Sequence, residues 1–300
     1  MPHAQPTEKP ADDAAHAAAL RASVLIDASE LAAAIDASAG PLVLAVRAPD
    51  APPPPPCATT ERIAGAQDID LATELAAPGG GRAGSRPLPD IASLQACLRR
   101  CGLREGGAVV VYDHDGGLQA ARAWWLLRWA GVADVRLLDG GFAAWQAAGL
   151  PTVRTRVVPE PGDVALSPGH LPQLDADAAQ RLARDGVLID SRITPNYEGG
   201  DTGPGEPKRG HIPGAVSVPA PANLDAAGRF RDAAALRALY AAAGVDGTRP
   251  VGLYCGAGVS AAHDLLALAS LGIDAPMYVG SWSAWSADPS RPAARGPSPG

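Results

Sequence analysis

The chain has 300 residues, which suffices for two domains of roughly 100 to 200 residues each, and its 47% hydrophobic content is enough for buried cores. Its formal net charge of −7 excludes the basic surface that a nucleic-acid-binding protein needs. No apolar run approaches the ~18 residues of a membrane-spanning helix, and the N-terminal segment lacks the basic stretch and apolar core of a secretory signal. We therefore expect a cytoplasmic protein that binds neither nucleic acid nor membrane.

The first half of the chain contains strand and helix patterns after a polar start. Residues 1–20 are rich in proline, alanine and acids, and we expect them to lack fixed structure. An apolar strand that ends in arginine is predicted at 42–50, and a continuously apolar strand of the kind buried on both faces at 108–112. A helix at 91–103 would place Cys97 and Cys101 on one face, where we expect them to be core residues.

The second half alternates helix and strand patterns more plainly. Helices are predicted at 171–186, 232–244, 260–272 and 281–288, and strands at 187–190, 251–254 and 275–280. Such alternation, punctuated by glycines, favours an α/β fold with a parallel sheet flanked by helices. The proline-rich residues 291–300 are expected to lack fixed structure.

The two halves repeat one another at an offset of about 140 to 150 residues. Four pairs of segments occur in the same order, namely 42–50 with 187–195, 62–70 with 211–219, 109–117 with 251–259, and 137–145 with 277–285. Because four ordered matches are hard to obtain by chance, the chain is interpreted as a tandem duplication. We expect a first domain at 21–153, a linker at 154–170 and a second domain at 171–290.

Cys255 lies between a predicted strand and a predicted helix. Ligands of parallel sheets bind beyond the carboxyl ends of the strands, and a helix N-terminus brings about half a positive elementary charge. Gly256 and Gly258 allow a tight turn, so that several amides can converge on the sulfur. We therefore expect an uncovered, reactive thiolate, with Ser260 as an N-cap whose hydroxyl also reaches the sulfur.

The first copy keeps no nucleophile, because Asp113 stands where the second copy has Cys255. A phosphatase of the C-x5-R type is excluded, since the sixth position after the cysteine is Ala261 rather than arginine. No C-x-x-C pair is present and the histidines are scattered, so we expect neither a metal site nor a cofactor. Cys57, in a proline run, is assigned no role.

The combined motifs resemble a known family. The chain is similar to the two-domain rhodaneses, the thiosulfate and 3-mercaptopyruvate sulfurtransferases, over about residues 20 to 290. The resemblance rests on Asp190-Ser191-Arg192, the HIPGA motif at 211–215, the CGAGVS loop at 255–260 and the GSWSAW segment at 280–285. It implies two tandem rhodanese-like domains, of which the first is catalytically silent. It also implies a sulfurtransferase in which Cys255 forms a persulfide that cyanide or a thiol acceptor discharges. The loop residues around the sulfur are Gly256, Ala257, Gly258, Val259 and Ser260.

The resemblance also implies donor-binding residues. Arg192 matches the arginine that binds the donor, and the alternative is an ion pair with a nearby acid such as Asp190 or Glu198. Asn196 and Arg62 are further candidates. The uncharged loop C-G-x-G-V-S is similar to the mercaptopyruvate branch, because thiosulfate would leave a second negative charge without a loop partner. However, Ala257 and Arg62 replace the serine and histidine of the family's proton relay, and Asn196 replaces a second arginine. These departures keep an alternative open, a persulfide carrier or interaction module with little small-molecule turnover.

Three further side chains are assigned structural roles. His211 opens the HIPGA turn, and we expect it to fix the geometry of that turn rather than take part in the chemistry. Trp282 and Trp285 have the i, i+3 spacing of neighbours on one helix face, which favours core packing.

Overall fold

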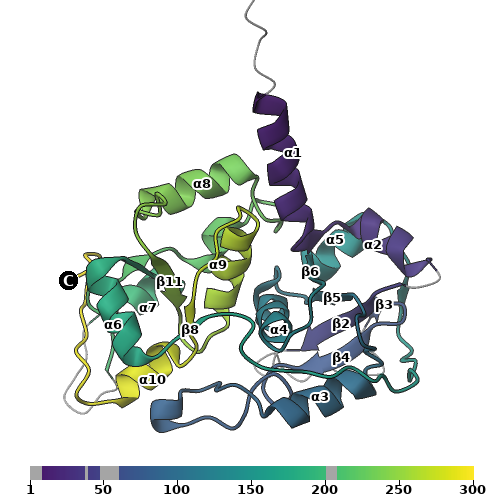
Figure 1. The fold of residues 1–300 in the computed structure, drawn as a ribbon, viewed down its shortest axis with the longest axis horizontal. Helices are drawn as coiled ribbons and strands as arrows, with labels where there is room; N and C mark the ends of the chain where they lie inside the picture. The colour runs from purple at the N-terminus through teal and green to yellow at the C-terminus, as the bar shows by residue number, and fades with distance from the viewer. Residues whose placement is uncertain (1–8, 38–39, 48–60, 201–207) are drawn as a thin grey trace, which may run out of the picture.

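Two five-stranded parallel sheets form the framework of the protein (Figure 1). The computed structural model describes residues 9–37, 40–47, 61–200 and 208–300. Alternate residues of the central strand of the first sheet enter two separate apolar clusters, Val109 and Val111 on one face and Val110 and Tyr112 on the other. Both faces of that sheet are therefore buried, as the continuous apolar pattern predicts.

The two sheets have the same strand order. The first runs β1-β6-β5-β2-β4, with β1 at Leu25–Ile26, β2 at Leu42–Arg47, β4 at Gln67–Asp70, β5 at Val109–Tyr112 and β6 at Val135–Leu138. The second runs β8-β12-β11-β9-β10, with β8 at Gln173–Leu174, β9 at Val187–Asp190, β10 at Val216–Ser217, β11 at Val251–Tyr254 and β12 at Met277–Tyr278. Each strand of the first sheet has a counterpart at the same place in the second, which confirms the tandem duplication.

Within the described residues, the four helices of the first domain repeat in the second, which has one short helix more. The first domain has α2 at Ala28–Ile35, α3 at Ile91–Arg100, α4 at Leu118–Trp129 and α5 at Gly141–Ala147. The second has α6 at Ala176–Asp185, α7 at Thr194–Glu198, α8 at Ala233–Ala242, α9 at Ser260–Ala269 and α10 at Ser281–Ala287. The remaining elements are the short helices η2 at Gly81–Ala83 and η3 at Ala220–Asn223, and an antiparallel pair of β3 at Arg62–Ile63 and β7 at Thr152–Val153. In the described parts of the chain, no helix has the length and apolar character needed to cross a membrane.

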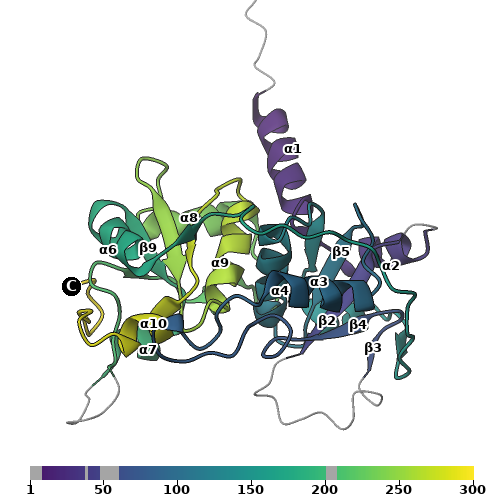
Figure 2. The same ribbon diagram turned by 60° about the horizontal axis from the view of Figure 1, so that its bottom comes forward.

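Helices α4 and α9 pack against each other where the two domains meet (Figures 1 and 2). Each of them begins just after the central strand of its own sheet, β5 or β11. The loop that leads into α9 therefore faces the first domain. This placement lets side chains of the first domain reach the loop that contains Cys255.

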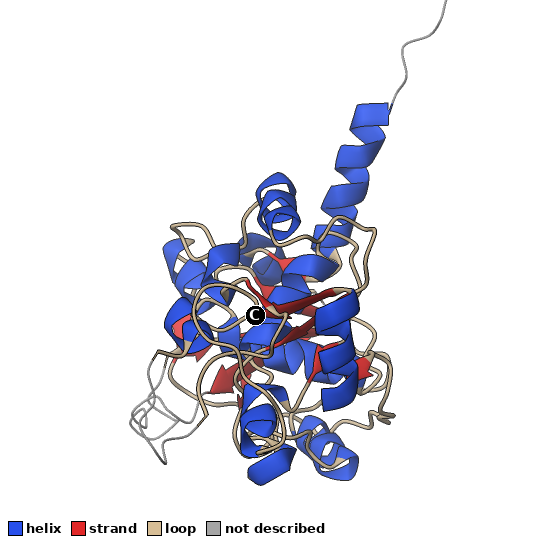
Figure 3. Ribbon diagram, turned by 90° about the vertical axis from the view of Figure 1, so that its left-hand side faces the viewer, coloured by secondary structure: helices blue, strands red, loops and turns tan. Residues whose placement is uncertain are grey.

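The expectation that residues 1–20 lack fixed structure is corrected for residues 9–20, whereas residues 1–8 lie outside the described part of the chain. Lys9–Ala22 forms the helix α1, which projects from the rest of the molecule (Figure 3). Its C-terminal end is held because the guanidinium of Arg21 pairs with Asp139 at 2.6 Å and donates to the carbonyl of Phe230 at 2.8 Å. The alanine-rich composition that reads as low complexity also has a high helix propensity.

The C-terminal segment 291–300 also has a fixed place, contrary to expectation. Ala294 and His211 exchange two backbone hydrogen bonds of 3.0 and 2.9 Å, and the amide of Gly214 donates to the carbonyl of Pro299 at 2.7 Å. The HIPGA turn has backbone groups that need partners, and the tail supplies them. His211 itself is buried, stacks on Tyr197 with a centroid separation of 3.8 Å, and lies 2.9 Å from the carbonyl of Tyr197 through Nδ1. Its predicted structural role agrees with these contacts.

Candidate active site

Cys255 follows β11 directly and is held through its backbone. Its amide donates to Oγ of Ser281 at 3.2 Å, and its carbonyl accepts from the amide of Trp282 at 2.8 Å. The amide of Gly258 points at the Cys255 sulfur, with an N···Sγ distance of 3.0 Å. Gly258 has φ +74°, and a Cβ there would come within 2.9 Å of Nη1 of Arg122. Only glycine fits this turn, and the turn aims an N–H at the sulfur.

The thiol is covered, whereas the sequence predicted it to be open. Cys255 is 1% exposed. The glycines do not keep the loop open, because the start of α10 bonds to its backbone. The amides of Trp282 and Ser283 bond to the carbonyls of Cys255 and Gly256.

Ser260 does not have the predicted capping role. The N-cap of α9 is Val259, without a side-chain cap, and Ser260 is the first helical residue. Its hydroxyl forms no hydrogen bond with the Cys255 sulfur in the described part of the chain. The tight turn at Gly258 starts the helix one residue before a serine N-cap would.

In the first domain, the equivalent loop before α4 surrounds a carboxylate with main-chain amides. Both carboxylate oxygens of Asp113 are held by amides of the loop that leads into α4 and of the first turn of α4. Four amides donate to it, those of Asp115 and Gly117 at 2.8 Å, Gln119 at 2.7 Å and Ala120 at 2.8 Å. Burial raises the pKa of Asp113, and these hydrogen bonds oppose the rise. The anion-binding position at a helix N-terminus is thus filled by the chain's own carboxylate.

Arg192 lies beside the Cys255 loop but is already partnered. Its Nε donates to Asp190 at 2.9 Å, and its Nη2 pairs with Asp190 at 2.5 Å and donates to the carbonyl of Gly210 at 2.7 Å. The guanidinium also stacks over the ring of Trp282, 4.8 Å from its centroid. Trp285 is buried in the core as predicted, whereas Trp282 is only partly buried and contacts this arginine.

The other two candidates are placed differently. Asn196 lies on α7 with its side chain exposed. Arg62, on β3 of the first domain, is fully buried and pairs with Asp68 at 2.6 Å. Asp68 also pairs with Arg47 at 2.8 Å, the residue at the repeat position of Arg192. Arg62 is therefore part of an ion-pair cluster of the first domain.

Two residues near Cys255 were not singled out from the sequence. Arg122 is the first of two arginines in the otherwise apolar α4, and Ser281 stands where the first repeat has Gly141. Both signals were present in the sequence, the first as a cation inside an apolar helix and the second as a serine aligned with a glycine. Neither reveals its contact with the Cys255 loop without the packing of α4 and α10.

Two residues of α9, His263 and Asp264, belong to a buried polar cluster. Asn223 donates to Asp264 at 2.6 Å and accepts from the hydroxyl of Tyr240 at 2.9 Å. Burial raises the pKa of Asp264 to about 8 and lowers that of His263 to about 4. His263 stacks on Phe230 at 4.4 Å. At neutral pH the imidazole is thus uncharged.

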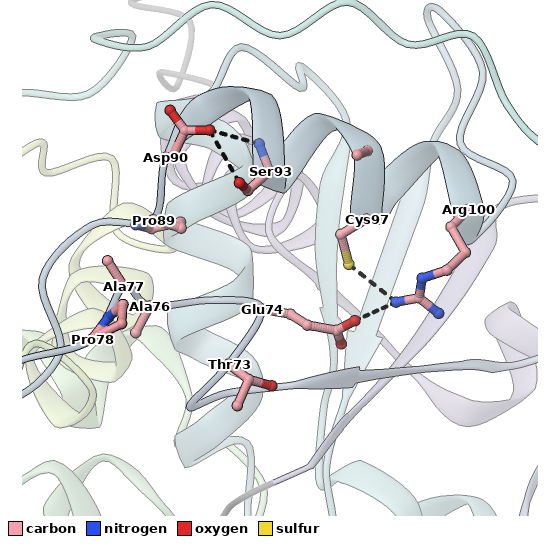
Figure 4. Close-up of a pocket in the computed structure, with 11 residues that line it drawn as sticks. Thr73, Glu74, Ala76, Ala77, Pro78, Pro89, Asp90, Ser93, Cys97 and Arg100 are labelled. Carbon is pink, nitrogen blue, oxygen red and sulfur yellow. Dashed lines mark hydrogen bonds and ion pairs between the residues drawn. The ribbon is translucent and has the colours of Figure 1, made fainter.

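The remaining described cysteines belong to the first domain. Cys97 and Cys101 are buried in its core, as predicted; Cys57 lies outside the described residues. Cys97 borders a pocket of about 430 Å³, where Arg100 donates to its sulfur at 3.3 Å and pairs with Glu74 (Figure 4). The hydrogen bond to Cys101 and burial raise the pKa of Cys97. This thiol is therefore a poor nucleophile at neutral pH.

Comparison with known proteins identifies the fold. A model of the rhodanese-like domain matches residues 27–148 and 175–288, one match around each sheet. SseB of Mycobacterium tuberculosis, provisionally named a thiosulfate sulfurtransferase, is 42% identical over 280 residues, which are 92% of this chain and 98% of SseB. A Pseudomonas aeruginosa protein provisionally named a 3-mercaptopyruvate sulfurtransferase is 43% identical over 242 residues, 78% of this chain and 84% of that protein. The crystal structure of SseA from Escherichia coli, described as a rhodanese fold, has a TM-score of 0.75 at 27% identity and covers 87% of this chain and 99% of its own. The chain therefore belongs to the rhodanese-like family, with one copy of the domain in each half.

Proposed function

We propose that Cys255 carries the transferred sulfur atom in this sulfurtransferase. The observation that carries the proposal is the Gly258 amide, which points at the Cys255 sulfur from 3.0 Å at the start of α9. An amide donor at a helix N-terminus favours an anion. The first-domain loop supports this assignment, because at the equivalent position before α4 main-chain amides surround the Asp113 carboxylate.

With thiosulfate as donor, the reaction needs no proton transfer to carbon. The Cys255 thiolate attacks the outer sulfur, the S–S bond of thiosulfate breaks, and sulfite leaves with the electron pair. Cyanide or a thiolate then attacks the outer sulfur of the persulfide. The Cys255 thiolate leaves and the enzyme is restored.

With 3-mercaptopyruvate as donor, a C–S bond breaks instead. The outgoing carbon must accept a proton to give pyruvate, and Ala257 has no hydroxyl to take part in that transfer. Loss of one general acid–base group typically costs about 10² to 10⁴ in rate. The uncharged Gly256 and Ala257 still favour a donor with a single negative charge, whose carboxylate would bind Nη1 of Arg192, the nitrogen not engaged by Asp190 or Gly210. We therefore expect slow turnover on both donors.

The test is mass spectrometry of the protein after incubation with each donor. The expected result is a gain of one sulfur atom on the peptide that contains Cys255, and its loss again when cyanide is added. The Cys255→Ser variant is the control and should gain nothing. If neither donor adds sulfur to Cys255, or if Cys97 gains it instead, the proposal is wrong.

A persulfide carrier with little small-molecule turnover is the second candidate. Two observations favour it, the 1% exposure of Cys255 and the engagement of Arg192 by Asp190. Steady-state assays with both donors separate the two, because a carrier would accept one sulfur per chain without continued turnover. A cytoplasmic location, where thiols stay reduced, suits either function and stays a prediction.

A further inference from the structure

We propose that Arg122, a residue of the first domain, supplies the positive charge that balances the anionic sulfur of Cys255 in the second domain. The inference rests on the proposed function, since it names a positioning residue for the same cysteine. Arg122 acts on that sulfur through Gly258 and across the domain interface.

The guanidinium of Arg122 is fully buried. Its Nη1 and Nη2 donate only to carbonyls, those of Gly258 at 3.3 Å and Arg86 at 3.4 Å, and its Nε has no hydrogen-bond partner. Within the described ranges, no carboxylate pairs with it. Buried charges in proteins are normally paired, so this cation calls for a negative partner.

The other buried arginines of the chain have the partner that Arg122 lacks. Arg62, also fully buried, pairs with Asp68 at 2.6 Å, and Arg192 pairs with Asp190 at 2.5 Å. The protein therefore follows the usual rule elsewhere. Arg122 is the exception, and it contacts the loop that contains Cys255.

Gly258 connects Arg122 to Cys255. Its carbonyl accepts from Arg122, and its amide donates to the Cys255 sulfur at 3.0 Å. Burial lowers the pKa of Arg122 to about 10, while the negative charge of Cys255 raises it and neighbouring Arg86 lowers it. Arg122 is thus charged at neutral pH, and the acidic group that interacts with it is the Cys255 thiol.

This arrangement gives the first domain a part in the chemistry. Asp113 leaves that domain without a nucleophile, but its α4 lies beside α9 (Figures 1 and 2) and brings a cation under the Cys255 loop. An enzyme reduced to the second domain would lack this charge.

The experiment measures the ultraviolet absorbance of thiolate against pH, as the difference between each protein and the same protein with Cys255→Ser. Arg122→Met removes the charge at similar size, and Arg122→Lys keeps it. Without Arg122 the midpoint for Cys255 should move to higher pH by about one unit, as for loss of a nearby opposite charge, whereas Arg122→Lys should stay within a third of that shift. Arg128→Met is the matched control, since Arg128 lies on the same helix but stacks on Trp124 at 5.3 Å, and should leave the midpoint unchanged.

The melting temperature of Arg122→Met in the Cys255→Ser background is a second measurement. If Arg122 only supported the fold, its loss would lower the melting temperature. In the Cys255→Ser protein the buried cation has no anionic partner, and replacing such a cation with an apolar side chain is often neutral or stabilising. Arg122→Met combined with Cys255→Ser should therefore melt no lower than Cys255→Ser alone. The proposal is overturned if the Arg122→Met midpoint equals that of the parent, or if Arg122→Lys shifts it equally. The titration needs no sulfur donor. A protein that shows the shift but gains no sulfur would contradict the proposed function alone, and one that gains sulfur without the shift would contradict this inference alone.

Discussion

The main-chain amide of Cys255 donates a hydrogen bond to Oγ of Ser281 at 3.2 Å, and Ser281 makes this contact from a left-handed backbone conformation with φ 55°. The equivalent residue of the first domain is Gly141, with φ 58°. A side chain in this region costs roughly 1 to 2 kcal/mol. The serine hydroxyl, which also donates to the carbonyl of Tyr278 at 2.9 Å, offsets part of that strain and fixes the backbone at Cys255.

Replacement of Ser281 separates strain from hydrogen bonding. Ser281→Ala keeps the strained backbone and leaves the buried Cys255 amide without its acceptor, so the free energy of unfolding should fall by about 1 to 3 kcal/mol. Ser281→Gly loses the same hydrogen bond but relieves the strain, and should be about 1 kcal/mol more stable than the alanine variant. Urea unfolding measures both. Equal stability of the two variants would show that Ser281 is not strained.

Asp113→Asn tests the amide cradle of the first domain. An asparagine offers one oxygen to the four amides and turns its own N–H groups toward the others, so the protein should lose at least about 2 kcal/mol of stability. Sulfur transfer by the folded protein should change by less than about twofold, because the proposed nucleophile, Cys255, lies in the other domain. Asp115→Asn is the control, since the Asp115 side chain has a single long contact with Gln119 at 3.4 Å. A large loss of sulfur transfer in folded Asp113→Asn would mean that the first domain is not silent.

Arg192→Lys tests donor binding. A lysine cannot keep both the pair with Asp190 and a second contact to an anion, so KM for 3-mercaptopyruvate should rise about tenfold or more. Iodoacetamide, which carries no charge, reports on Cys255 without this contact, and its rate of alkylation should stay within about twofold. A slower alkylation together with an unchanged KM would assign Arg192 to the support of the loop rather than to the donor.

Asp264→Asn should change how stability depends on pH. Burial raises the pKa of Asp264 from 3.8 to about 8 in the folded protein, so the folded state retains a proton that the unfolded chain releases above about pH 4. This contribution to stability is complete below pH 4 and is lost as the pH rises toward 8, at up to about 1.4 kcal/mol per pH unit. Asparagine does not titrate. The variant should therefore gain stability relative to the parent across this window.

The measurement is the free energy of unfolding by urea at several pH values between 4 and 8. His263, whose pKa burial lowers to about 4, titrates in both proteins, so its contribution cancels in the difference. A difference between variant and parent that is the same at every pH would show that Asp264 is ionised throughout.

Several features of this protein follow from its sequence alone. The duplication is visible as ordered matches between the two halves, whereas the strand that ends before Cys255, the glycine at position 258 and Asp113 in the first copy are local patterns. Local periodicity and turn chemistry encode them, because each depends on residues close together in the chain. The misassigned terminal segments are the exception. Lys9–Ala22 follows the helix propensity of its alanines, and residues 291–300 have a fixed place because the HIPGA turn bonds to them.

The surroundings of the sulfur were decided by tertiary structure. Arg122 reaches Gly258 from 136 residues away, and the start of α10 bonds to the backbone of Cys255 and Gly256. Which charges meet depends on how α4 packs on α9 and how α10 closes over the loop. Sequence spacing carries no information on these distances, because the elements that set them are joined by long segments of chain.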